Sequence, residues 1–198
     1  MINKLEYLNP LTGLNLTLFP NFLNRRQSSL LFDILENEIA WEKTQVKVFG
    51  KIYPVPRLTA FLGDEGIHYK YSGQIHAAAP WLPSLLDIKA QIESKAGQAF
   101  NSVLLNRYNN GLDKMGWHAD NEKELGPEPV IASLNLGASR RMDFKSKKNP
   151  KEKYAIQLED GMLLIMGKGC QEHFYHQIPV QKKITEIRIN LTFRQILQ

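Results

Sequence analysis

The sequence contains a single cysteine, Cys170, among its 198 residues. One cysteine excludes an intrachain disulfide and a metal site built from cysteines alone, and it is typical of a reducing compartment. The sequence also lacks the apolar run of about eighteen residues that a membrane-spanning helix needs. Its first sixteen residues show neither the apolar core nor the cleavage site of a signal peptide. We therefore expect an intracellular protein, cytoplasmic in a bacterium or nuclear in a eukaryote, with no membrane partner.

The composition is that of a folded enzyme or binding protein rather than of a disordered chain. Hydrophobic residues make up 43% and charged residues 23% of the sequence, close to the averages of globular proteins. Lysine and arginine exceed aspartate and glutamate by 25 to 20, and the sequence pI is near 9.2. This excess modestly favours a polyanionic partner such as nucleic acid, but an ordinary basic enzyme explains it equally well.

Two segments in the first half have the apolar spacing of amphipathic helices. In residues 24–41 the predicted stripe is Leu30, Leu31, Ile34, Leu35 and Ile39. A second stripe in residues 82–97 comprises Leu85, Ile88, Ile92 and Ala96, with Ser84 as the predicted N-cap and Gly97 as the predicted stop.

The second half favours β-structure. Seven short stretches rich in β-branched or aromatic residues are separated by turn-like segments: 102–108, 130–136, 140–144, 153–158, 161–166, 173–178 and 186–193. No repeat or low-complexity linker divides the chain. We predict a single domain of the mainly β, α+β class, in which helices support an antiparallel sandwich or jelly roll.

The stretch "GWHADNE" contains a candidate metal site. His118 and Asp120 stand two residues apart, so on a strand their side chains would point to the same face. A 2-His-1-carboxylate triad for Fe(II) needs one more histidine, and "HFYHQIP" offers His173 and His176. Strand alternation does not choose between these two. Zinc is the rival metal, although the sequence has no His-Glu-x-x-His helix.

The segment "EIRINLTFRQI" alternates apolar and polar residues. Arg188, Asn190, Thr192 and Arg194 share one face of the expected strand. The simple interpretation is a solvated face, but a jelly roll can instead turn such a face into an internal pocket. There an arginine would bind a carboxylate through two parallel hydrogen bonds. Asn106 and Tyr108 form a second polar pair on one face.

In this order, "NRYNNG … GWHADNE … HFYHQIPV … RINLTFRQI" resembles the AlkB family of Fe(II)- and 2-oxoglutarate-dependent nucleic-acid demethylases. It is most similar to the homologues that repair alkylated double-stranded DNA. The resemblance runs from about Val46 to Ile196. It implies a double-stranded β-helix, with an N-terminal extension, a nucleotide-recognition lid and supporting helices in residues 1–97 and the catalytic core in residues 98–198.

The resemblance also implies roles for individual residues. His118, Asp120 and His176 would bind Fe(II). Asn106, Tyr108 and Arg188 would hold the distal carboxylate of 2-oxoglutarate, while Asn190, Thr192 and Arg194 would line its metal-binding end. O₂ is the remaining co-substrate.

Substrate contacts are implied in three further stretches. "VFGKIYPVPR" resembles a hairpin that enters a DNA duplex, and it contributes Phe49, Gly50 and Lys51. "HYKYSG" resembles a segment whose aromatic residues stack on the extruded base, here Tyr69, Lys70 and Tyr71. Asn121 and Glu122 follow the aspartate ligand, and Asn121 replaces an acidic residue of close relatives. Core packing is the alternative for the aromatic residues.

A lysine-rich stretch, "FKSKKNPKEKY", carries five lysines between Lys145 and Lys153. It is interpreted as a loop that contacts DNA phosphates, and a solvated hairpin is the alternative.

The implied reaction is oxidative demethylation of bases such as 1-methyladenine and 3-methylcytosine, with release of formaldehyde, succinate and CO₂. The expected partner of the monomeric enzyme is alkylated DNA, primarily double-stranded, with single-stranded DNA or RNA as alternatives. Two other hypotheses stay open: an oxygenase that acts on RNA or on a substrate other than nucleic acid, and a basic nucleic-acid-binding module with a vestigial metal site.

Overall fold

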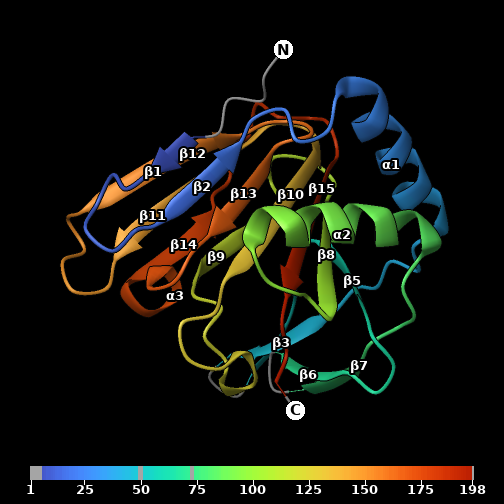
Figure 1. Cartoon of the computed structure of the whole chain (residues 1–198), viewed down its shortest axis with the longest axis horizontal. Coiled ribbons are helices and arrows are strands. Elements are labelled where there is room, and N and C mark those ends of the chain that lie inside the picture. The colour runs from blue at the N-terminus through green and yellow to red at the C-terminus, as the bar shows by residue number, and fades with distance from the viewer. Residues whose placement is uncertain (1–5, 49–50, 72–73, 198) are drawn as a thin grey trace.

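The computed structural model describes residues 6–48, 51–71 and 74–197, and for residues 45–48, 51–54, 69–71 and 74–76 it describes the backbone alone (Figure 1). Three α-helices are present in this part of the chain: α1 (Arg25–Glu38), α2 (Pro83–Ala96) and the short α3 (Cys170–His173). One 3₁₀ turn spans Lys123–Leu125.

Two antiparallel sheets form the centre of the molecule. The large sheet has the order β1-β2-β13-β10-β15-β8-β5, and the small sheet has the order β12-β11-β14-β9. The large-sheet strands are β1 (Glu6–Leu8), β2 (Leu16–Phe19), β13 (Leu163–Met166), β10 (Ile131–Gly137), β15 (Arg188–Arg194), β8 (Ser102–Tyr108) and β5 (Leu58–Gly63). The small-sheet strands are β12 (Lys153–Leu158), β11 (Arg140–Ser146), β14 (Phe174–Ile178) and β9 (Met115–His118).

Apolar side chains fill the space on both faces of the large sheet. One cluster, which includes Leu16, Phe144 and Leu164, lies between the two sheets. The other packs α1 and α2 onto the opposite face, and it includes Leu35, Leu85 and Leu191. The helices thus support the sheet from outside, and the space between the sheets is left for a site.

Helix α1 occupies the predicted segment and begins with a capping box. The Asn24 side chain accepts a hydrogen bond from the backbone N–H of Gln27, and the Gln27 side chain accepts one from Asn24. Leu31 and Leu35 are buried as expected. The prediction for Leu30 is wrong, because that side chain is 61% exposed.

Helix α2 also lies in its predicted segment, but its start differs. Leu82 is the N-cap and Pro83 the first helical residue, so the predicted cap at Ser84 is wrong. Proline suits this position because the first N–H of a helix has no partner within the helix. Gly97 ends the helix in the left-handed conformation, with φ 69°, as predicted.

All seven strands expected in the second half are present, as β8 and β10 to β15. Strand β9, which contains a glycine and no β-branched residue, was not predicted from the sequence, and neither were the first-half strands β1, β2 and β5. Helix α3, which occupies residues 170–173, was not predicted either. Strand β2 pairs with β13, and β5 pairs with β8, so residues from the first half complete the large sheet.

Two separate hairpins lie at one end of the molecule (Figure 1). One pairs β3 (Gln45–Val48) with β4 (Lys51–Pro54), and the other pairs β6 (His68–Tyr71) with β7 (Gln74–Ala77). Phe49 and Gly50 of the predicted wedge lie outside the described residues. No helix in the described part of the chain is long and apolar enough to cross a membrane.

Candidate active site

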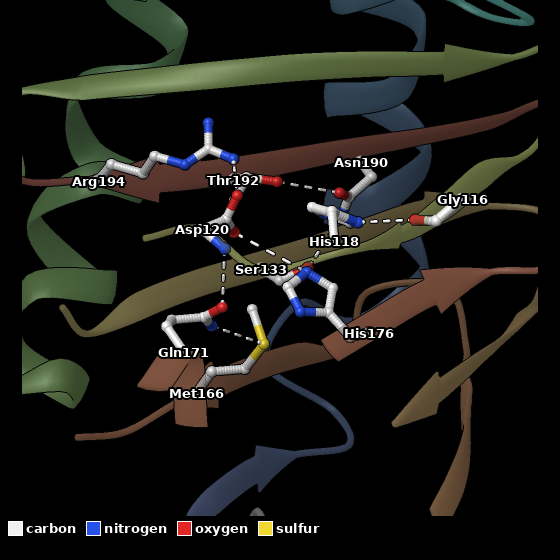
Figure 2. Close-up of polar contacts among 10 residues, drawn as sticks. All are labelled: Gly116, His118, Asp120, Ser133, Met166, Gln171, His176, Asn190, Thr192 and Arg194. Carbon is white, nitrogen blue, oxygen red and sulfur yellow. Dashed lines mark hydrogen bonds and ion pairs between the residues drawn. The ribbon is translucent and has the colours of Figure 1, made fainter. Parts of the chain in front are cut away.

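Three side chains converge between the two sheets: His118 at the end of β9, Asp120 just after it, and His176 on β14 (Figure 2). One candidate ligand atom from each lies within 4.8 Å of the others. The two imidazole ring centres are 4.1 Å apart, and Asp120 and His176 are buried. Two imidazoles and one carboxylate suit Fe(II) with open coordination positions, and they equally suit Zn²⁺.

A β-bulge aims His118 into the site. His176 pairs with His118, but Ile178 pairs with Met115, so β9 has one more residue than β14 over this interval. The extra residue lets Met115 and His118, three positions apart, both line the same pocket. Nδ1 of His118 lies 2.9 Å from the carbonyl oxygen of Gly116. A proton on Nδ1 would donate to that oxygen and leave Nε2 free to bind a metal.

Asp120 is held by two contacts. Its backbone N–H donates to the side-chain oxygen of Gln171 across 2.9 Å, and its Oδ1 accepts from Nη2 of Arg194 across 2.8 Å. Strand β9 ends at His118, so strand alternation is not what brings His118 and Asp120 together. The expected convergence is present, but it is produced by the contacts that Gln171 of α3 and Arg194 of β15 make to Asp120 in the loop after β9.

The structure distinguishes the two candidate histidines. His176 points into the site from β14, and Oδ2 of Asp120 lies 3.9 Å from its Nε2. The His173 side chain is 53% exposed and lies near Glu172 at the end of α3. His176 is therefore the histidine that shares the site with His118 and Asp120.

The protonation states of His118, Asp120 and His176 favour the binding of a metal cation. Burial, together with nearby His118, lowers the pKa of His176 to about 3, and burial also lowers the pKa of His118. Burial alone would raise the pKa of Asp120, but Arg194 and the two histidines outweigh it and bring it to about 2. At neutral pH the site therefore presents two neutral imidazoles and one carboxylate, the forms that bind metals.

The polar face of β15 lines a pocket beside this cluster and is not solvated. All seven residues of β15 are buried. Arg188, Asn190, Thr192 and Arg194 line the pocket together with Asn106 and Tyr108. The solvated alternative for this face is therefore wrong.

Arg188 carries donors without acceptors. It is 1% exposed, and burial lowers its pKa to about 10, so it stays charged at neutral pH. Its Nη2 donates to the side-chain oxygen of Asn135, while no described residue accepts from Nε or Nη1. A buried guanidinium with two unused N–H groups is suited to a carboxylate ligand.

Several residues of the pocket were missed in the sequence. Ser133 and Asn135 on β10 lie opposite Thr192 and Asn190 on β15. Nδ2 of Asn190 donates to Oγ of Ser133, and Oγ1 of Thr192 donates to Oδ1 of Asn190. The signal that identified β15, polar residues two apart in an apolar strand, is also present in "VIASLNL".

Arg57 is a buried basic residue beside the pocket that was not predicted from the sequence. It is 6% exposed, and its Nε donates to Oδ1 of Asn106 across 2.6 Å. Asn106 is thus oriented by a protein partner before any ligand arrives.

The predicted substrate contacts are only partly described. Lys51 lies on β4, and Tyr69, Lys70 and Tyr71 form part of β6, with the backbone alone described. Asn121 is exposed and Glu122 half-buried, directly after Asp120.

The lysine-rich stretch forms the hairpin between β11 and β12, in which Lys145 pairs with Lys153. Nζ of Lys145 lies 4.4 Å from the ring centre of Trp117, and Nζ of Lys147 lies 4.9 Å from that of Tyr175. Lys147 also donates to the carbonyl oxygen of Gln171. The base of the hairpin is therefore packed against the strands that carry the histidines.

Comparisons with known proteins agree with this geometry. The family model described as "2OG-Fe(II) oxygenase superfamily" matches residues 15–194, so the similarity begins well before Val46, where the motifs alone placed it. DNA oxidative demethylase ALKBH2 of Homo sapiens is 40% identical over 183 residues, which cover 87% of this chain and 70% of the relative. Alpha-ketoglutarate-dependent dioxygenase alkB homolog 3 of Rattus norvegicus is 35% identical over 198 residues, covering 96% of this chain and 66% of the relative.

The fold has a solved counterpart as well. The structure of OsALKBH1 matches with a TM-score of 0.68 at 16% identity, covering 97% of this chain and 100% of that chain, which supports the jelly-roll fold alone. The family match and the two relatives determine the class of enzyme and its co-substrates. The chain belongs to the AlkB family of the 2OG-Fe(II) oxygenase superfamily and is a dioxygenase that uses Fe(II), 2-oxoglutarate and O₂.

Proposed function

We propose that this dioxygenase removes N-linked methyl groups from bases of alkylated DNA. The observation that carries the proposal is the His118, Asp120 and His176 cluster, which opens onto a pocket where buried Arg188 has two unused donors. Support for DNA as the substrate comes from relatives named DNA oxidative demethylase, which are 39–40% identical to this chain.

The residues present fit an iron ion and its co-substrate. His118, Asp120 and His176 would hold Fe(II), which, when bound, supplies the activation of O₂. Arg188 would bind the distal carboxylate of 2-oxoglutarate through Nε and Nη1, assisted by Tyr108 and Asn106. Asn190, Thr192 and Arg194 would line the end of the co-substrate nearer the metal.

The overall reaction is balanced by the two co-substrates. One oxygen atom of O₂ enters succinate as 2-oxoglutarate loses CO₂, and the other enters the N-methyl C–H bond. The resulting N-hydroxymethyl group loses formaldehyde and leaves an N–H on the base. The protein contributes orientation and a pocket between the sheets from which bulk water is excluded.

A methylated base inside a duplex must be extruded to reach this pocket. Methylation at N1 of adenine or N3 of cytosine blocks the pairing edge and adds positive charge, which weakens pairing and lowers the cost of extrusion. We therefore propose 1-methyladenine and 3-methylcytosine as the bases acted on. In this proposal Phe49, Gly50 and Lys51 enter the duplex, and Tyr69, Lys70, Tyr71, Asn121 and Glu122 contact the extruded nucleotide.

The β11–β12 hairpin supplies a basic contact surface. Its five lysines between Lys145 and Lys153 would bind phosphates, which fix the position of the strand without reading sequence. Packing of Lys145 and Lys147 against Trp117 and Tyr175 orients the base of the hairpin. Binding through these lysines would weaken as salt concentration rises.

The deciding experiment measures succinate and formaldehyde after anaerobically loaded enzyme is mixed with O₂ and a methylated oligonucleotide. We expect both products in equal amounts with DNA carrying 1-methyladenine, and little formaldehyde with the unmethylated strand. Formaldehyde from methylated RNA alone would favour the RNA alternative, and absence of succinate under all conditions would favour the vestigial binding module. We further propose that the enzyme is monomeric and intracellular; gel filtration tests the first statement.

A further inference from the structure

Arg140 is a fully buried arginine at the far end of the pocket from the metal cluster. It is 0% exposed and begins β11, where it shares the inward face with Met142 and Phe144. Its guanidinium donates four hydrogen bonds: Nε to the side-chain oxygen of Gln181, Nη1 to the carbonyl oxygen of Asn110, and Nη2 to the carbonyl oxygens of Asp113 and Pro179.

Arg140 is a buried cation whose hydrogen-bond acceptors carry no charge. Within the described ranges no carboxylate forms an ion pair with it, and all four acceptors are neutral. Burial lowers its pKa, which reflects the cost of removing the charge from water. Hydrogen bonds to neutral oxygens of two loops do not by themselves require a full positive charge.

The Tyr108 ring connects Arg140 to the co-substrate pocket. The guanidinium carbon of Arg140 lies 5.5 Å from the ring centre of Tyr108, and that of Arg188 lies 5.0 Å from the same centre. Tyr108 is 1% exposed and lines the pocket, whereas Arg140 does not. Arg140 therefore contacts the pocket through Tyr108.

Three of the four hydrogen bonds hold backbone carbonyl oxygens of two loops, and the fourth holds the Gln181 side chain of the second loop. Residues 110–113 lie in the loop after Tyr108, and residues 179–181 follow β14, which carries His176. The two segments also bond to each other, from the N–H of Gln181 to the carbonyl oxygen of Gly111. No side chain fits at Gly111, where an added Cβ would lie 1.9 Å from the Gln181 carbonyl oxygen. Arg140 thus lies under a closely packed junction of two loops.

We propose that Arg140 is a positioning residue for the distal carboxylate of the co-substrate. It fixes the Tyr108 ring, and its charge adds to that of Arg188 at the end of the pocket where that carboxylate would bind. Arg140 and Arg188 repel each other when the pocket is empty, and a carboxylate between them and the metal cluster relieves this repulsion. Arg140 thereby favours 2-oxo acids with a second carboxylate. The inference rests on the proposed co-substrate site.

The test compares two ligands on three variants. Metal-loaded protein, with Mn²⁺ in place of iron, is titrated with 2-oxoglutarate and with pyruvate, which has the same 2-oxo acid end without the distal carboxylate. For Arg140→Met we expect 2-oxoglutarate binding to weaken by about tenfold, as for loss of a desolvated cation–π contact, and pyruvate binding to stay the same. Arg140→Lys keeps the charge but not the planar fork, so its loss should be smaller.

Arg107→Met is the matched control. Arg107 lies on the same strand as Tyr108, but its guanidinium points to Glu36 on α1. This variant should bind both ligands like the wild type. Steady-state kinetics give a second readout: in Arg140→Met the KM for 2-oxoglutarate should rise while kcat at saturating 2-oxoglutarate is retained.

Two results would overturn the inference. Equal weakening of 2-oxoglutarate and pyruvate in Arg140→Met would show general damage to the loops, and unchanged binding of both would show that Arg140 does not act on the pocket. If thermal unfolding shows that Arg140→Met is not folded, the same two criteria apply to Arg140→Lys. A different result would show that the proposed co-substrate site itself is wrong: wild-type protein would then bind 2-oxoglutarate no more tightly than pyruvate.

Discussion

Arg194 and Asp120 form a buried ion pair at the centre of the site, with Nη2 of Arg194 2.8 Å from Oδ1 of Asp120 and side chains that are 3% and 4% exposed. The arginine occupies one carboxylate oxygen, and the other oxygen, Oδ2, is the one 3.9 Å from Nε2 of His176. Arg194 therefore fixes the carboxylate in an orientation that leaves Oδ2 directed toward the two histidines.

Removing Arg194 should destabilise the protein and weaken metal binding. Arg194→Met leaves Asp120 as an uncompensated buried charge, so we expect a loss of about 3–5 kcal/mol in the free energy of unfolding of the metal-free protein. Urea denaturation measures the loss, and Mn²⁺ titration measures metal affinity. Unchanged metal affinity would mean that the Gln171 contact alone orients Asp120.

His176 and His173 should differ sharply when replaced. His176→Ala removes one of three ligands and should reduce bound iron to near background, whereas His173→Ala removes an exposed side chain and should leave it intact. Metal content after dialysis is the measurement, and formaldehyde release should follow it. Equal losses in the two variants would show that His173 matters for folding, because Gly13 packs closely against its ring.

Arg188→Ala should weaken 2-oxoglutarate binding by about 2–5 kcal/mol, the range for removing one partner of a buried charge pair. Arg188→Lys should restore only part of the affinity, because an ammonium group does not reproduce two parallel hydrogen bonds. The dissociation constant of 2-oxoglutarate for the Mn²⁺-loaded protein checks both statements. Wild-type affinity in Arg188→Ala would remove Arg188 from the co-substrate site.

The prediction for Phe49 depends on the sequence alone. An apolar wedge fills the gap left by an extruded base, and a single strand has no such gap. We expect Phe49→Ala to lose activity mainly on double-stranded DNA, by about 1–3 kcal/mol if stacking is lost. Initial rates on one 1-methyladenine oligonucleotide, with and without its complement, provide the comparison. A similar fall on both substrates would show that Phe49 stabilises the lid instead.

Cys170 should make stability sensitive to alkaline pH. Burial raises its pKa to about 12, and its Sγ donates to the carbonyl oxygen of Asn15. Because the folded pKa is raised, the stabilisation is complete below the unfolded pKa of about 8.5 and is lost as pH rises toward 12. Between pH 8 and pH 10, wild type should lose about 1–2 kcal/mol more than Cys170→Ala in urea denaturation. Parallel pH curves for the two proteins would contradict this.

The sequence predicted the regular elements well where one face of each is apolar. Strands β8 and β10 to β15 were predicted from apolar or β-branched stretches, and Leu31 and Leu35 mark the buried stripe of α1. Predictions made from single residues were weaker. Leu30 belongs to the apolar spacing but lies beyond the area that the sheet covers, and Pro83 starts α2 where Ser84 was expected.

Sequence motifs predicted the metal ligands and the polar face of β15, but they did not predict the hydrogen bonds that orient these side chains. Gln171 and Arg57 reach the site from distant parts of the chain, separated by 51 residues from Asp120 and by 49 from Asn106. Such contacts depend on the loop paths, which local patterns do not encode. Arg140 did have a local signal, since it alternates with Met142 and Phe144 on an inward face.

The bulge in β9 makes the length of that strand as important as its composition. Met115 and His118 face the same pocket only because the strand has one residue more than β14 opposite it. Residues three apart in a regular strand face opposite sides, so if β9 paired with β14 without the bulge and kept its present length, either the methionine or the histidine would lie on the outer face of the small sheet. Among otherwise similar chains, one that is a residue shorter between the methionine and the histidine would place both on the pocket face through regular pairing, so the length of this segment and the presence of the bulge have to change together.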